Sequence, residues 1–125
     1  MPIHVSWDNE HRTVIRYEFL NPWTWQDLSA AIDRVDEMIR DVPYTVHFIA
    51  DMTRGDTLPD KFLTHISALS RKVRGRDGLI AVVNTNTFAQ AVYGIFTRLN
   101  NNVMSRVVFT PSLQAARAHL EVALK

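Results

Sequence analysis

Two short, nearly continuous apolar runs constrain the fold of this chain more than any other feature. They cover residues 44–50 and 79–83, and neither shows the polar–apolar alternation of a strand with one face in solvent. Runs this short are atypical of buried helices, whereas strands buried on both faces have this length and composition. The two runs therefore predict inner, parallel strands of a sheet that carries helices on both faces.

The first 20 residues follow a different pattern, with a period of two. Ile3, Val5 and Trp7 alternate with polar residues, and the same alternation returns at positions 15, 17 and 19. Alternation of this kind is typical of half-buried strands. The polar stretch 8–12 between the two segments predicts that they form an antiparallel hairpin.

Apolar residues at helical spacing predict four helices. The first covers 24–41, where Thr24 and Asp27 have the spacing of a capping box. The second follows Pro59, the third covers 86–100, and a short strand at 107–109 precedes a last helix that opens at 110–112. The predicted order is ββαβαβαβα in one α/β domain, residues 1–125. Its mixed sheet combines the N-terminal antiparallel hairpin with inner parallel strands, and helices flank it.

Composition narrows the class of protein. A chain of 125 residues is expected to fold as one domain, and its net charge of +1 gives no overall attraction to nucleic acid. The absence of cysteine excludes disulfides and thiolate catalysis and favours a cytoplasmic location. No secretion leader is visible, and polar residues at 84–87 interrupt the uncharged run 78–97, so no stable membrane insertion is expected.

Three segments in a fixed order bear most on function: residues 23–28 (WTWQDL), 47–53 (HFIADMT) and 109–116 (FTPSLQAA). Together with the predicted order of elements, they resemble the STAS family over nearly the whole chain. The nearest likeness is to its SpoIIAA-like branch of anti-sigma-factor antagonists, which shares a fold description with lipid-binding Sec14-type domains. The resemblance implies a non-enzymatic regulatory or protein-interaction module that docks a protein partner. The alternative is a carrier of a small apolar ligand or lipid, with a pocket under helix 86–100.

The region 54–59 departs from the family pattern. Antagonists that switch by phosphorylation carry an Asp-Ser-Ser-Gly-like element at the start of the second helix, whereas this chain reads Arg-Gly-Asp-Thr-Leu-Pro there. Asp56 and Thr57 are the residues that stand in for the Asp-Ser of that element, so Thr57 is the candidate phosphorylation site. Because the serines are missing and Pro59 follows, we expect docking that does not depend on a kinase.

The ends of the inner strands are the expected binding edge. If these strands are parallel, the turns 51–59, 84–87 and 110–112 lie together beyond their carboxyl ends, where α/β sheets usually bind ligands. The candidate partner- or ligand-binding residues on this edge are Asp51, Thr53, Arg54, Asp56, Thr57, Asn84 and Asn86. The alternative is that Thr57, Asn86 and Thr110 only cap helices.

The sequence contains no motif for catalysis or metal binding that we recognise. Its five histidines lack zinc-binding spacing, and its serines and glycines form neither a nucleophile elbow nor a phosphate-binding loop. We therefore expect no metal, no cofactor and no enzymatic activity. His47 lies inside an apolar run and is expected to find a hydrogen-bond partner in or near the core.

Charge and aromatic residues bear on the choice of partner. The first predicted helix carries five acidic residues and two arginines, whereas the second helix and its exit are basic. This asymmetry suits a charged protein partner or a second copy of the chain, but the favoured interpretation is that both helices simply present solvated outer faces. The third helix has more apolar surface than contact with a sheet requires, so we expect a homodimer.

The three tryptophans are expected to differ in burial. Trp7 and Trp23 are expected to pack in the core, and Trp25 to protrude.

Overall fold

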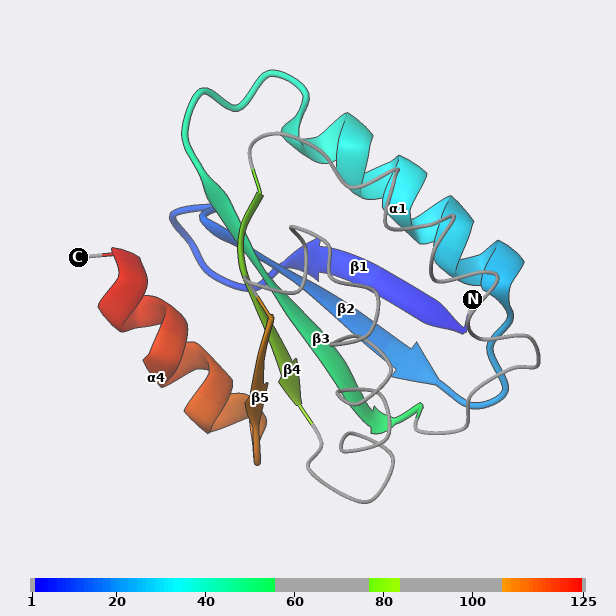
Figure 1. Ribbon diagram of the computed structural model, residues 1–125. Helices are drawn as coiled ribbons and strands as arrows, with labels where there is room; N and C mark the ends of the chain where they lie inside the picture. The colour runs from blue at the N-terminus through cyan, green and yellow to red at the C-terminus, as the bar shows by residue number, and fades with distance from the viewer. Residues whose placement is uncertain (1, 56–76, 84–106, 125) are drawn as a thin grey trace.

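The computed structural model describes residues 2–55, 77–83 and 107–124 (Figure 1). Its strands are β1 (Ile3–Trp7), β2 (Val14–Leu20), β3 (Val46–Arg54), β4 (Asp77–Val83) and β5 (Val107–Thr110), and its helices are α1 (Trp25–Ile39) and α4 (Leu113–Leu124). The helices predicted after Pro59 and over 86–100 lie outside the described residues. So do the candidate site residues Asp56, Thr57, Asn84 and Asn86.

The strands form one sheet in the order β1-β2-β3-β4-β5. β1 is antiparallel to β2, and each of the other neighbouring pairs is parallel. The structure thus confirms the α/β class and the mixed sheet, with an antiparallel N-terminal hairpin and parallel inner strands. In Figure 1, α1 and α4 lie on opposite faces of this sheet, with α1 against β1 and α4 against β3, β4 and β5.

The turn of the hairpin is built around one side chain. Asn9 Oδ1 accepts hydrogen bonds from the amides of Thr13 (3.0 Å) and Val14 (3.3 Å), and Asn9 Nδ2 donates to Thr13 Oγ1 at 2.6 Å. Arg12 completes the turn with a positive φ of 56°, and its carbonyl accepts a hydrogen bond from the Tyr44 hydroxyl at 3.0 Å. The asparagine therefore satisfies backbone donors that the short connection would otherwise leave without partners.

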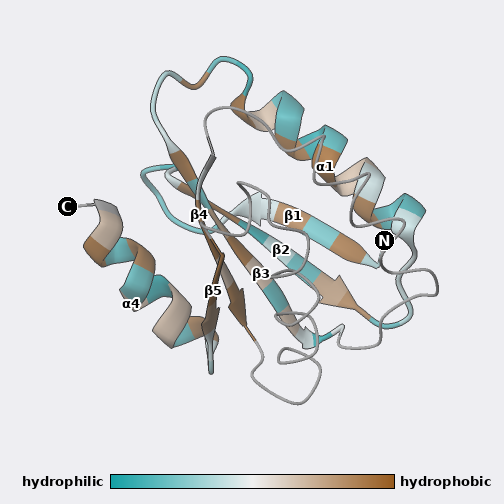
Figure 2. Cartoon of the chain, viewed as in Figure 1, coloured by the Kyte–Doolittle hydropathy of each residue, from teal (hydrophilic) through white to brown (hydrophobic). Residues whose placement is uncertain are grey.

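The predicted capping box at the start of α1 is confirmed. Thr24 Oγ1 accepts a hydrogen bond from the Asp27 amide at 3.0 Å, and Asp27 Oδ2 accepts one from the Thr24 amide at 2.8 Å. The helix ends at Ile39, two residues before the predicted end at position 41. Its apolar stripe is buried against the sheet, and Figure 2 shows hydrophilic and hydrophobic residues alternating around it.

The two faces of the sheet have different cores. On the α1 face, aromatic and branched residues form two adjoining clusters: Ile3, Phe19, Trp23, Trp25 and Ala31 in one, and Ile15, Val35, Ile39, Val46 and Phe48 in the other. On the α4 face, the core is aliphatic and consists of Val14, Ile49, Ala81, Val83, Ala116 and Leu120. Because β3 contributes to both cores, its first half is buried on both faces, as the apolar run 44–50 predicted.

The prediction for β3 was wrong at both ends. The strand begins at Val46 instead of Tyr44, and it continues to Arg54 instead of ending at Ala50. The physical reason is pairing with β2: Asp51 lies opposite Glu18, and Arg54 lies opposite Leu20, so β3 continues for as long as its neighbour does. The predicted turn 51–59 therefore contains strand residues up to Arg54.

His47 lies inside β3 and has the core partner that the sequence predicted. Its Nδ1 accepts a hydrogen bond from the Leu79 amide of β4 at 2.9 Å, at a register irregularity between the two strands. A Cβ on Gly78 would overlap the imidazole ring, so only glycine fits against it. Burial lowers the pKa of His47, because desolvation disfavours the charged ring. The neutral ring thus completes the β3–β4 ladder at this point.

Candidate functional site

The carboxyl end of β3 is fastened to the segment that leads into α1. Trp23 Nε1 donates a hydrogen bond to the Gly55 carbonyl at 2.9 Å, and the Asn21 amide donates to the Arg54 carbonyl at 2.9 Å. Gly55 lies so close to Phe19 that a Cβ at this position would overlap its backbone and Cβ. The two segments, far apart in sequence, therefore form one rigid edge of the molecule.

Aromatic packing supports this edge from inside. Trp23 packs edge-to-face against Phe19 and against Trp25, with ring centroids 5.0 Å and 5.2 Å apart. The expectation that Trp23 lies in the core is confirmed, because it is 4% exposed. The expectation that Trp25 protrudes was wrong, since it is 8% exposed. The reason is that its first-turn position points it back onto the Trp23 ring rather than outward.

Exposed polar side chains cover the outside of the same edge. We call this surface the docking edge and define it by the exposed residues Asn21, Thr24, Gln26, Thr53 and Arg54. β4 ends at Val83, which lies opposite Asp51, so β3 extends beyond its described β4 neighbour by the last residues of the strand. The end of β3 thus presents its side chains on a scaffold that the hydrogen bonds of Trp23 and Asn21 hold in place.

The predicted site residues on β3 do not form one cluster. Asp51 is half-buried, and its Oδ1 accepts a hydrogen bond from the Thr53 amide at 3.2 Å. β3 gains one residue relative to β2 between Asp51 and Arg54, and such a bulge re-aims the side chains that follow it. Asp51 lies two positions after Ile49, a residue of the α4-side core, and therefore on the α4 face of the strand, where it adds a small contribution to the raised pKa of Arg117. The structure therefore assigns Thr53 and Arg54 to the docking edge and directs Asp51 toward α4.

The last strand-to-helix turn follows the capping alternative, with a different residue from the predicted one. Ser112 Oγ accepts a hydrogen bond from the Ala115 amide at 3.0 Å, so Ser112 caps α4. Thr110 was named as a capping residue, but it is buried, and its hydroxyl donates to the Val82 carbonyl at 3.2 Å. Thr110 therefore links β5 to β4 and makes no contact with the docking edge among the described residues.

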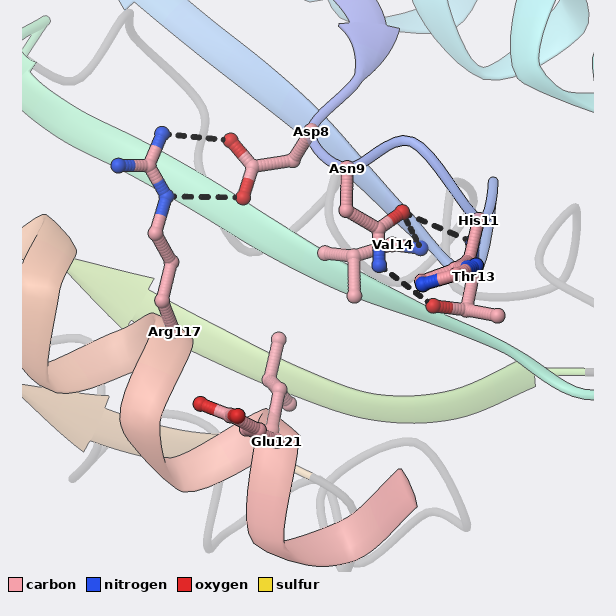
Figure 3. A pocket seen from close by; sticks show the side chains of 8 residues that line it. Asp8, Asn9, His11, Thr13, Val14, Arg117 and Glu121 are labelled. Carbon is pink, nitrogen blue, oxygen red and sulfur yellow. Dashed lines mark hydrogen bonds and ion pairs between the residues drawn. The ribbon is translucent and has the colours of Figure 1, made fainter. Parts of the chain in front are cut away.

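A second feature, an open cleft of about 630 Å³, lies between the hairpin turn and α4 (Figure 3). The hairpin side of its lining comes from residues around the turn, and the helix side from the middle of α4. Its lining residues are Asp8, Asn9, His11, Thr13, Val14, Arg117, Leu120 and Glu121. Since Thr13 and Val14 precede the body of β2, the cleft lies at the opposite end of the parallel strands from the docking edge.

An ion pair joins the two sides of this cleft. Arg117 Nε donates to Asp8 Oδ2 at 2.9 Å, and Arg117 Nη2 donates to Asp8 Oδ1 at 2.8 Å, which gives the bidentate geometry visible in Figure 3. The Asp8 side chain is 6% exposed, whereas that of Arg117 is 49% exposed. The hydrogen bond to Asp8 raises the pKa of Arg117, against the opposing effect of burial. The two hydrogen bonds thus hold the helix and the hairpin turn together.

No pattern in the sequence indicates this cleft. Asp8 and Arg117 are 109 positions apart, and each is unremarkable where it stands: one in a polar turn, the other on the outer side of a helix. Chemically, the cleft offers hydrogen-bond donors and acceptors above an apolar floor of Val14 and Leu120. Asp8 neutralises Arg117, so the cleft has no net positive charge with which to select an anion.

Within residues 2–55, 77–83 and 107–124, no three histidine or acidic side chains lie together in a way that would hold a metal ion. Neither of the two described helices combines the length and the apolar character that crossing a membrane requires. The pocket predicted under helix 86–100 falls outside these ranges.

Comparisons with known proteins returned nothing to set beside this geometry. No family model matches the chain, and no curated protein or solved structure is significantly similar to it.

Proposed function

We propose that this protein is a non-enzymatic interaction module that docks a partner protein through the docking edge. The observation that carries the proposal is the hydrogen bond from Trp23 to Gly55, which fixes the start of α1 and the end of β3 as one surface. Recognition residues on a rigid scaffold lose little conformational entropy on binding, so a fixed polar edge favours docking. We place the module in the cytoplasm.

The strand order and the sequence resemblance support the same proposal. A hairpin followed by parallel strands in sequential order agrees with the STAS-like arrangement that the three segments suggested. Two of these segments, 23–28 and 47–53, contribute to the docking edge or run directly into it. In the proposed mode, the side chains of Thr53 and Arg54 contact the partner, while Trp23 holds the surface that carries them.

The proposal is tested by measuring partner affinity for matched variants. Arg54→Ala and Thr53→Ala should each weaken docking of a captured partner by about ten-fold or more, because contact residues at the centre of an interface contribute about 1–2 kcal/mol or more. Arg16→Ala is the control, since it removes an arginine from the body of β2 and away from this edge. Unchanged affinity for both edge variants would contradict the proposal.

Thr57 provides a second, independent test of how docking is controlled. In the proposed constitutive mode, Thr57→Glu changes the affinity no more than Thr57→Ala does. Release of the partner by Thr57→Glu alone would instead indicate a phosphorylation switch, since the substitution adds a negative charge next in sequence to Asp56.

The carrier of a small apolar ligand is the competing function, and one measurement separates the two. Native mass spectrometry of the purified full chain should give the mass of the protein alone. A co-purifying mass of lipid size would contradict docking as the main function and favour the carrier.

A further inference from the structure

The outer edge of β1 has hydrogen-bonding groups that point away from the sheet. The Asp8 amide donates to Val14, and the Leu20 amide donates to Pro2, both at 2.7 Å, which fixes the phase of the antiparallel β1–β2 ladder. In such a ladder, hydrogen-bonded pairs alternate with non-hydrogen-bonded pairs. The even positions of β1 therefore bond to β2, and the amides and carbonyls of Ile3, Val5 and Trp7 face outward.

No described segment pairs with the outer edge of β1. The strand also lacks the sequence features that commonly protect an edge strand from pairing with another chain. β1 is the first strand in the sheet order, with β2 as its neighbour among the described residues. Natural edge strands are commonly blunted by lysine, by proline or by a bulge. Ile3–Trp7 reads Ile-His-Val-Ser-Trp and contains neither lysine nor proline, and its register with β2 is regular throughout.

The pattern of β1 is symmetrical about Val5, and the geometry points to a second copy of this chain as its occupant. We infer that two β1 strands pair antiparallel around a two-fold axis beside Val5, which joins the two sheets into one. This register makes Val5 of both copies a hydrogen-bonded pair, and it makes Ile3 of each copy a hydrogen-bonded pair with Trp7 of the other. The outward amides and carbonyls of all three residues then have partners.

The side chains agree with this register. On the α1 face, Ile3 of one copy meets Trp7 of the other, so apolar residues lie opposite apolar residues. On the other face, the exposed His4 of one copy lies opposite the exposed Ser6 of the second. No like charges face each other along the strand. A two-fold contact must be self-complementary, and this strand satisfies that condition.

The position of α1 gives the proposed dimer an electrostatic signature. α1 packs against β1, and a two-fold axis perpendicular to the sheet keeps both copies of α1 on the same face. Each helix region, 24–41, carries five acidic residues and two arginines. Because salt screens repulsion between like-charged helices, the dimer should tighten as ionic strength rises from about 0.05 M to about 0.5 M.

This self-association goes beyond the proposed docking function and uses a different part of the surface. The docking edge is built from the end of β3 and the start of α1, whereas the proposed interface is the free edge of β1. One short strand per copy buries less area than a standard stable interface, so we expect dissociation constants of roughly 10 µM to 1 mM.

Amide hydrogen exchange on the full chain tests the predicted hydrogen bonds residue by residue. Spectra are recorded at about 20 µM and at about 1 mM protein, two concentrations between which the dimer population rises for any dissociation constant in the expected range. The amides of Ile3, Val5 and Trp7 should gain protection by about two-fold or more at the higher concentration. The amides of His4 and Ser6, which already bond to β2, should change much less. Equal protection at both concentrations for all five amides would overturn the inference.

Two matched double variants test the register independently. His4→Lys/Ser6→Lys places like charges opposite each other twice across the two-fold axis, whereas His4→Glu/Ser6→Lys places opposite charges there. Sedimentation equilibrium should show the mixed-charge variant dimerising about ten-fold or more tightly than the all-lysine variant. Equal dissociation constants for the two variants would overturn the proposed register.

A proline variant tests the edge itself. Val5→Pro removes an outward-facing amide that β2 does not use, which edge strands tolerate, and it should abolish the dimer while the monomer stays folded by circular dichroism. If this variant does not fold, the two charge variants and the exchange pattern still decide the question. A wild-type chain that stays monomeric to about 1 mM, or a folded Val5→Pro variant that dimerises as well as wild type, would overturn the inference.

Discussion

The two faces of the sheet hold their helices by different means. α1 lies on rings and branched side chains, with Phe19, Trp23 and Trp25 packed edge-to-face. α4 lies on smaller aliphatic residues, and an ion pair between Asp8 and Arg117 ties its outer side to the hairpin turn. α1 is therefore held mainly by buried apolar area, whereas α4 also depends on charged and titratable groups on its face of the sheet.

The largest loss of stability is expected from a substitution in the aromatic core on the α1 face of the sheet. Trp23→Ala should lower the free energy of unfolding by about 3–5 kcal/mol, because it leaves a cavity beside two rings and removes the hydrogen bond to Gly55. Urea denaturation followed by far-ultraviolet circular dichroism measures the loss. Trp23→Phe keeps an aromatic ring without the indole donor, so it should cost less. A loss below about 1 kcal/mol together with lost partner binding would show that Trp23 is a contact residue instead.

The next largest effect is expected from the ion pair between Asp8 and Arg117. The alanine variants of the two residues should lose different amounts of stability. Arg117→Ala removes the hydrogen-bond partner of both oxygens of the Asp8 carboxylate, whose side chain is 6% exposed in the intact pair, and should cost about 1–3 kcal/mol. Asp8→Ala leaves the Arg117 guanidinium half exposed to water, so it should cost about 1 kcal/mol or less. Thermal or chemical denaturation of both variants measures the difference. Equal losses would argue against burial of the carboxylate as the cause.

A pH-dependent effect is expected from His47. Its pKa in the folded state is lowered from 6.5, so below about pH 6.5 the unfolded chain binds a proton that the folded chain resists. This contribution to stability is therefore full above the unfolded pKa and is lost as the pH falls toward the lowered folded value. Denaturation at about pH 8, 6.5 and 5 measures it. His47→Asn offers a non-titrating acceptor to the Leu79 amide, so the stability of this variant should depend less on pH over this range. If its free energy of unfolding changes with pH as steeply as that of the wild type, another group causes the effect.

The smallest change in stability is expected from a half-exposed ion pair on the α4 face of the sheet. Arg16 and Glu18 form an ion pair at 3.7 Å, with side-chain exposures of 27% and 29%. Surface pairs of this kind contribute little, because water screens the charges and ordering the side chains costs entropy. Arg16→Ala should change the free energy of unfolding by less than about 0.5 kcal/mol. A loss above about 1 kcal/mol would show that this part of the face contributes more to stability than its exposure indicates.

Local features of the fold could be predicted from the sequence, whereas features that depend on a distant partner could not. The hairpin and the capping box at Thr24 are set within a few residues, and their patterns were sufficient. The length of β3 depends on how far β2 continues beside it, and no property of residues 51–54 alone shows this. Burial of Trp25 likewise depends on Trp23 and Phe19 being brought together.

The candidate site divides in the same way. Thr53 and Arg54 were identified because polar residues at the carboxyl end of an inner strand are a general signal for binding. The support of that end by Trp23 was missed, because Gly55 and Trp23 meet only in three dimensions. The cleft was missed for the same reason: Asp8 and Arg117 lie near opposite ends of the chain, and a single sequence carries no pattern that links them.

The crossed rings of Trp23 and Trp25 have a consequence for spectroscopy. Two indoles at 5.2 Å with an interplanar angle of 83° interact through their electronic transitions, and their coupling depends strongly on mutual orientation. The pair lies directly beneath the surface where α1 begins and β3 ends, so a distortion of that surface changes the coupling before secondary structure is lost. The near-ultraviolet circular dichroism of this protein therefore serves as an intrinsic optical probe of the docking edge, without any added label.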